Sequence, residues 1–157
     1  MSKRKSLFME TTNIPAQRTA HEIQALLADA GARHIQCDYD GAGKVTAMNF
    51  VLLVHGVPHP FRLPARVEAI QRVFKERRVK TMKWHAHKFE EKDREQAERV
   101  GWRQLKRWLE AQLALVETEM VEMREVFAPY LLAEDGRTLF ECLETTRFKA
   151  LPPGKEA

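Results

Sequence analysis

One stretch constrains the fold of this chain more than any other, because residues 94–132 carry the pattern of a long amphipathic helix. Apolar side chains recur there at steps of three and four residues, which puts them on one side of an α-helix. They are Trp102, Leu105, Leu109, Leu113, Val116 and Met120. We therefore expect this side to be buried, in a helix that begins between residues 90 and 94 and runs to about residue 119.

Charge is distributed unevenly along the same helix. The basic residues of the first half are Arg99, Arg103, Lys106 and Arg107, and the acidic residues of the second half are Glu117, Glu119, Glu122 and Glu125. Two such helices can lie antiparallel, so that the basic half of one faces the acidic half of the other. One hypothesis is therefore a protein-interaction module whose long helix docks on a second copy or on another protein.

Ahead of the long helix, the sequence predicts a helix followed by a small antiparallel sheet. The helix is expected over 19–32, with Thr19 as its N-cap and Gly31 at its end. Strands are expected over 34–38, 45–54 and 61–63. The prolines at 58, 60 and 64 bracket the third strand and place it at a sheet edge, because proline cannot donate to a ladder.

The second half of the chain is expected to be mainly helical. A helix is predicted over 65–78, and residues 121–132 either continue the long helix or form a separate one, since Pro129 limits an unbroken run. A closing helix is expected over 138–148, with Leu139, Phe140 and Leu143 turned inward. The fold predicted is a single α+β domain over 1–157, in which 1–64 hold a helix and a three-stranded antiparallel sheet, 65–150 are mainly helical and 151–157 form a disordered tail.

The length and amino-acid composition of the chain restrict the class of protein to which it can belong. A chain of 157 residues with 44% hydrophobic content can bury a core without disulfide or metal staples. Its only cysteines, Cys37 and Cys142, are too few for a disulfide framework and fit a reducing compartment. The basic start is followed by no apolar signal segment, and apolar runs such as 51–54 are too short to cross a bilayer. We expect a cytoplasmic protein with no membrane segment.

The strongest functional signal is a basic band within a chain of net charge +4. The band holds Arg62, Arg66, Arg72, Lys75, Arg77, Arg78, Lys80, Lys83 and Lys88, with Trp84 among them. Dense Lys and Arg suit a phosphate backbone, whose condensed counterions they release, and a tryptophan can stack on a base. The first hypothesis is a non-enzymatic nucleic-acid-binding protein that uses this band and the basic start of the long helix. The alternative interpretation is a solvated face that keeps the protein soluble.

Signals for catalysis or metal binding are weaker. His85 and His87 form an HxH pair that can supply two ligands to zinc, but no cysteine pair or HExxH motif accompanies it, which favours a polar linker. Asp38 and Asp40 lie beside a turn, and Asp40 with Gly41 is an ordinary turn pair. No nucleotide-binding or nucleophile motif is present. A metal-dependent enzyme stays a third hypothesis, and no cofactor is expected.

Several short patterns resemble a family of small proteins encoded by bacteriophages and other mobile elements. They are 18–23 (RTAHEI), 61–64 (FRLP), 102–106 (WRQLK), 110–112 (EAQ) and 125–131 (EVFAPYL) before 135–139 (DGRTL). The resemblance covers most of the chain. It implies a setting, a bacterium that carries a phage or prophage, and because the family has no assigned activity it implies no site residue.

Overall fold

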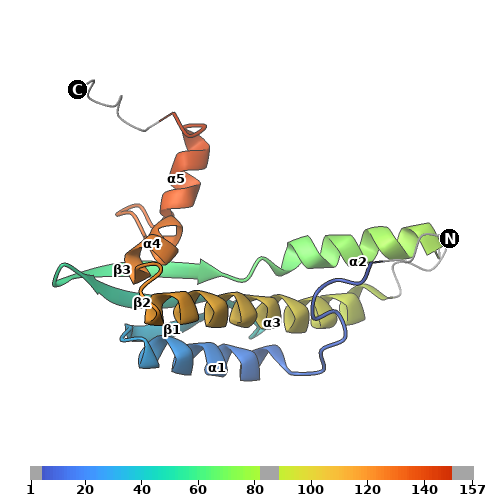
Figure 1. Ribbon diagram of the computed structural model, residues 1–157. Coiled ribbons are helices and arrows are strands. Elements are labelled where there is room, and N and C mark those ends of the chain that lie inside the picture. The colour runs from blue at the N-terminus through green and yellow to red at the C-terminus, as the bar shows by residue number, and fades with distance from the viewer. Residues whose placement is uncertain (1–4, 82–88, 150–157) are drawn as a thin grey trace.

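The computed structural model describes residues 5–81 and 89–149, and Figure 1 shows their arrangement. The order of elements is one helix, three strands and a run of helices. A three-stranded antiparallel sheet packs with helices, and the C-terminal half is helical, so the predicted α+β fold is confirmed. None of the helices in the described parts of the chain has both the length and the apolar character of a membrane span.

The sheet consists of β1 (Arg33–Tyr39), β2 (Val45–Val54) and β3 (Val57–Pro64), with β2 in the centre. Strands β2 and β3 are joined by a two-residue turn, in which His55 has φ 51° and Gly56 has φ 79°. Positive φ at both central residues gives a turn whose twist matches that of the flanking strands. The tight turn fixes the register of the hairpin, which pairs Val54 with Val57.

Strand β3 is longer than the expected segment 61–63, and it includes the prolines at 58, 60 and 64. Strand β3 can contain these three prolines for a geometric reason. Backbone N–H groups of successive residues point to opposite sides of a strand, so three prolines at even positions remove donors from the same side. That side is the outer edge, because the β2–β3 ladder is intact and the carbonyl oxygen of Pro60 accepts a hydrogen bond from the N–H of Leu132, at 2.9 Å.

Helices α1 (Ala16–Asp29) and α3 (Glu90–Glu117) lie side by side against the sheet and run in the same direction (Figure 1). The expected N-cap at Thr19 is wrong: α1 begins at Ala16, after Pro15, and Thr19 is buried in its first turn. Proline lacks an N–H and its fixed φ suits the entry to a helix, which explains the earlier start. Trp102 and Leu109 of α3 are fully buried, as the apolar stripe predicts.

Helix α2 (Val67–Thr81) packs antiparallel along the first half of α3 (Figure 1). A second cluster of buried side chains lies between them and comprises Val67, Phe74, Ala97 and Val100. Gly101 of α3 permits this close approach, because a Cβ at its position would lie only 3.2 Å from Cδ1 of Ile70. An alanine at 101 would therefore require the Ile70 side chain to shift by a few tenths of an ångström.

The C-terminal segment folds back onto β3. It consists of α4 (Met123–Phe127), a short 3-10 helix η2 (Ala128–Tyr130) and α5 (Leu139–Thr145), and Leu131 forms a bridge with Phe61. Phe127 is fully buried, with its ring 5.2 Å from that of Phe50. Two expectations for this region are wrong. Met120 follows the end of α3 and is 71% exposed, and Leu139 is 37% exposed because α5 stands away from the main core.

Residues 5–15, here called the N-terminal strap, cross the surface of α3 before α1 begins. The side-chain amide of Gln96 donates to the carbonyl oxygens of Glu10 and Thr12, both at 2.9 Å. The amide of Gln104 donates to the carbonyl oxygen of Phe8, at 2.8 Å. The strap is thus attached largely through its own backbone.

Candidate nucleic-acid interface

Two arginines of the basic band, Arg77 and Arg78, face the rest of the protein. Arg78 donates two hydrogen bonds to the carboxylate of Asp93, at 2.6 and 2.5 Å, and Asp93 is 6% exposed. The hydrogen bonds to Asp93 raise the pKa of Arg78 above its ordinary value. Arg77 donates to Glu10, at 3.0 Å, and to the carbonyl oxygen of Lys5. Both side chains therefore fasten α2 to α3 and to the N-terminal strap.

Four other cations of the band keep their charged groups in solvent, and we call them the exposed α2 cations. They are Arg72, Lys75 and Lys80 of α2 together with Arg66, which lies immediately before the helix. Within residues 5–81 and 89–149, Arg72 and Lys80 have no ion-pair or hydrogen-bond partner for their side chains. Lys75 reaches Glu90 at 3.3 Å, but its side chain is 63% exposed. Glu68 and Glu76 are also exposed on α2 and reduce the positive potential there.

Arg62 of the band lies apart from α2, on the sheet. Its guanidinium is 3.3 Å from the carboxylate of Asp38, and Asn49 donates to the same carboxylate at 2.6 Å. The three residues form a row across β1, β2 and β3. The charge of Arg62 is therefore partly balanced on the sheet surface.

The basic half of α3 is largely engaged with α1 and with its own helix. Arg103 and Lys106 lie 2.7 and 3.0 Å from the carboxylate of Glu22, and the side chain of Arg103 is only 5% exposed. Hydrogen bonds from Lys106 and then Arg103 lower the pKa of Glu22 from 4.5 to about 2. Arg107 pairs with Glu110 at 3.0 Å. This network joins α1 to α3, and the sequence pattern does not identify Glu22 as its centre.

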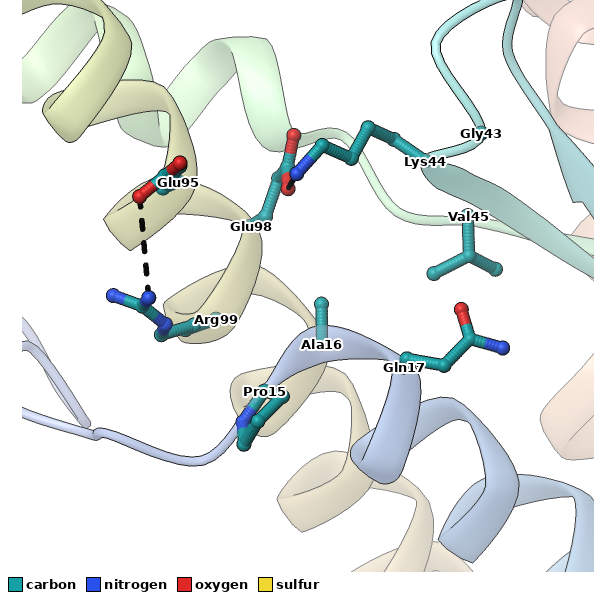
Figure 2. Close-up of a pocket in the computed structure, with 9 residues that line it drawn as sticks. All are labelled: Pro15, Ala16, Gln17, Gly43, Lys44, Val45, Glu95, Glu98 and Arg99. Carbon is teal, nitrogen blue, oxygen red and sulfur yellow. Dashed lines mark ion pairs between the residues drawn. The ribbon is translucent and has the colours of Figure 1, made fainter.

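Figure 2 shows a pocket of about 290 Å³ at the start of α1. Two cations line it, and each faces a carboxylate. Lys44 lies 3.4 Å from Glu98, and Arg99 lies 4.0 Å from Glu95. Because the charges are balanced in pairs, this pocket does not favour an anion over a neutral ligand.

A second depression, of about 470 Å³, lies where α2, α3, η2 and α5 meet. We call it the Trp108 groove, and its walls are mainly apolar and aromatic. Its main lining residues are Arg66, Ile70, Leu105, Trp108, Tyr130 and Phe140. No local sequence signal identifies this groove, because its walls come from segments far apart in the chain. Arg66 is the member shared with the exposed α2 cations.

The remaining predicted site residues lie outside the described residues. Lys83, Trp84 and Lys88 fall in the segment 82–88, as do His85 and His87 of the metal hypothesis. Among residues 5–81 and 89–149, no group of three or more His, Cys, Asp or Glu side chains is arranged to hold a metal ion.

Comparison with known proteins finds no matching family model, curated protein or solved structure. The resemblance to mobile-element proteins therefore stays a prediction. The physical basis for a function lies in the geometry of the exposed α2 cations and of the Trp108 groove.

Proposed function

We propose that this protein is a non-enzymatic, nucleic-acid-binding accessory protein that contacts phosphates through the exposed α2 cations. The setting we propose is the bacterial cytoplasm, in a cell that carries a phage or prophage. DNA and RNA are equally compatible with contacts to a phosphate backbone.

One observation carries this proposal: Arg72, Lys75 and Lys80 on α2, with Arg66 just before it, are exposed and only Lys75 has an ion pair, whereas most described cations elsewhere face carboxylates. At 1.5 Å per residue, α2 rises about 20 Å from its first residue, Val67, to Lys80, and Arg66 lies just before that first residue. A row of that length can follow several successive phosphates of one strand. Lys83 and Lys88 continue the band in sequence and stay part of the prediction.

Several members of the predicted band are left out of the proposed interface. Arg77, Arg78, Arg103 and Lys106 make short contacts with carboxylates, so binding a phosphate would require breaking an existing ion pair. Arg103 is also almost fully buried. Their physical role is to hold helices together.

The self-association hypothesis for the long helix receives less support. It requires Arg99, Arg103 and Lys106 to face acidic residues of a second copy. In the folded chain Arg103 and Lys106 face Glu22 instead, and α3 lies between α1, α2 and the sheet. A second copy would therefore have to compete with contacts that the folded chain already makes.

The test is a comparison of two triple variants that remove the same charge. The first replaces Arg72, Lys75 and Lys80 with Gln, which takes the net charge from +4 to +1. The second replaces Arg33, Arg147 and Lys149, which are exposed elsewhere on the protein, with Gln and makes the same change in net charge. Binding to labelled DNA and RNA is measured by fluorescence anisotropy over a series of salt concentrations.

We expect the α2 triple to weaken binding to all sequences alike and to flatten the plot of log affinity against log salt. The slope should fall by about 0.7 to 0.9 for each phosphate that the variant no longer neutralises. The matched triple should have a much smaller effect. Equal losses of affinity in both variants would mean that only diffuse charge matters, and no binding by the wild type at low salt would refute the proposal.

A further inference from the structure

The Trp108 groove exposes aromatic surface that the fold holds in fixed positions. The ring of Trp108 makes edge-to-face contacts with Tyr130, at 5.8 Å, and with the buried Phe127, at 6.1 Å. Trp108, Tyr130 and Phe140 are each only partly buried. Aromatic side chains that are fixed yet accessible form a suitable surface for a flat ligand.

A cation stands at the edge of this aromatic surface. The guanidinium of Arg66 lies 5.3 Å from the centre of the Phe140 ring, and no carboxylate among the described residues lies within ion-pair distance of it. Of the other polar side chains in the lining, the amide of Gln104 already donates to the carbonyl oxygen of Phe8. The groove therefore offers aromatic contact and a positive charge that Glu141 balances only from beyond ion-pair distance, which matches a ligand with a flat ring and an attached anion.

A nucleotide has both features, but in a duplex its base is stacked between neighbours. An unpaired base can turn out of its strand and enter an aromatic groove without the energetic cost of breaking a base pair. Arg66 belongs both to the groove and to the exposed α2 cations, so a strand whose base enters the groove is led directly onto α2.

We propose that the Trp108 groove receives one unstacked base of a single-stranded nucleic acid, with the adjacent phosphate on Arg66 and the strand continuing along α2. This inference rests on the proposed function and adds the class of ligand to it. It predicts a preference for single strands that the charge of α2 alone does not explain.

The test uses single-stranded and duplex oligonucleotides of the same sequence with two variants of the groove. Phe140→Ala removes one aromatic wall, and Ala69→Leu fills the groove from an exposed position of α2 without changing charge. Leu139→Ala is the matched control, because Leu139 lies on the same helix as Phe140 but does not line the groove. Thermal melting checks that each variant is folded.

We expect Phe140→Ala to weaken single-strand binding by about 5- to 150-fold, the range for loss of one stacked base. Ala69→Leu should also weaken it, whereas Phe140→Tyr should retain most of the wild-type affinity. Duplex binding should be weaker than single-strand binding in the wild type and unchanged in the groove variants. Leu139→Ala should behave as the wild type in both assays.

Two results would overturn the inference and leave the proposed function standing. In one, Phe140→Ala and Ala69→Leu bind single strands as tightly as the wild type, while the α2 triple variant binds more weakly. In the other, the wild type binds duplex as tightly as the single strand. Absence of any nucleic-acid binding by the wild type at low salt would instead refute the proposed function, and the inference would fall with it.

Discussion

The indole N–H of Trp102 donates a hydrogen bond to the backbone carbonyl oxygen of Val45, at 3.2 Å, in the interior of the protein. Trp102 is fully buried and Val45 is 5% exposed. Trp102 lies near the middle of α3, and Val45 is the first residue of β2. The contact thus joins the longest helix to the central strand, and it explains why an apolar stripe contains a tryptophan at this point.

Replacing Trp102 with Phe tests this contact. Phenylalanine keeps an aromatic ring but leaves the carbonyl oxygen of Val45 without its buried donor, which costs about 1 to 3 kcal/mol. The smaller ring adds a packing defect to that loss. Urea unfolding followed by circular dichroism should give a lower free energy of unfolding for the variant. An unchanged free energy of unfolding would mean that water or another group replaces the indole as the donor to Val45.

The carboxylate of Glu22 makes stability dependent on pH. Its pKa is about 2 in the folded protein, below the value of 4.5 expected without partners. A carboxylate with a lowered pKa stabilises the folded state above pH 4.5, and this contribution is lost as the pH falls from 4.5 towards 2. Glu22→Gln should be less stable than the wild type at neutral pH, with a difference that shrinks over that interval. Unfolding midpoints measured in a pH series check this, and a constant difference would contradict it.

Leu109 and Met120 both belong to the apolar stripe in sequence but differ in the fold. Leu109 is fully buried, whereas Met120 is 71% exposed. We expect Leu109→Ala to destabilise the protein by about 2 to 5 kcal/mol, because it leaves a cavity. Met120→Ala should change stability by less than about 0.5 kcal/mol. Thermal and urea denaturation of both variants checks the assignment of the buried face, and similar effects at the two positions would contradict it.

The pair Arg78 and Asp93 should contribute to the attachment of α2 to α3. A double-mutant cycle with Arg78→Met and Asp93→Asn should give a coupling energy of about 1 to 3 kcal/mol, towards the lower end because the side chain of Arg78 is 33% exposed. The exposed pair Arg137 and Asp135 is the matched control and should show a smaller coupling that high salt removes. Equal coupling in the two pairs would mean that burial of Asp93 adds nothing.

Local sequence patterns predict much of this fold, and their failures have identifiable causes. Strand β2 has the predicted bounds, because the turns at Gly43 and Gly56 enclose its largely apolar sequence. The predicted start of α1 is too late, since Thr19 has the chemistry of an N-cap but Pro15 lies ahead of it. The predicted third strand is too short, because the sequence alone does not reveal that the prolines of β3 all face one edge.

The candidate site is predictable only in part. The sequence locates the basic band, but it does not distinguish cations that have partners from those that do not. The partners are distant in sequence, because Arg77 pairs with Glu10 and Arg103 with Glu22, at separations of 67 and 81 residues. The Trp108 groove cannot be predicted from local sequence for the same reason, because its lining residues are spread between positions 64 and 140. Only tertiary structure brings such residues together.

The attachment of the N-terminal strap through its backbone affects which of its residues can change in evolution. Gln96 and Gln104 bind its carbonyl oxygens, a group that every amino acid provides. The ring of Phe8 is 62% exposed and plays no part in these hydrogen bonds. Selection should therefore act more strongly on the two glutamines than on a strap position such as Phe8, so that related chains retain Gln96 and Gln104 on α3, together with the Glu10 carboxylate that pairs with Arg77, while position 8 diverges.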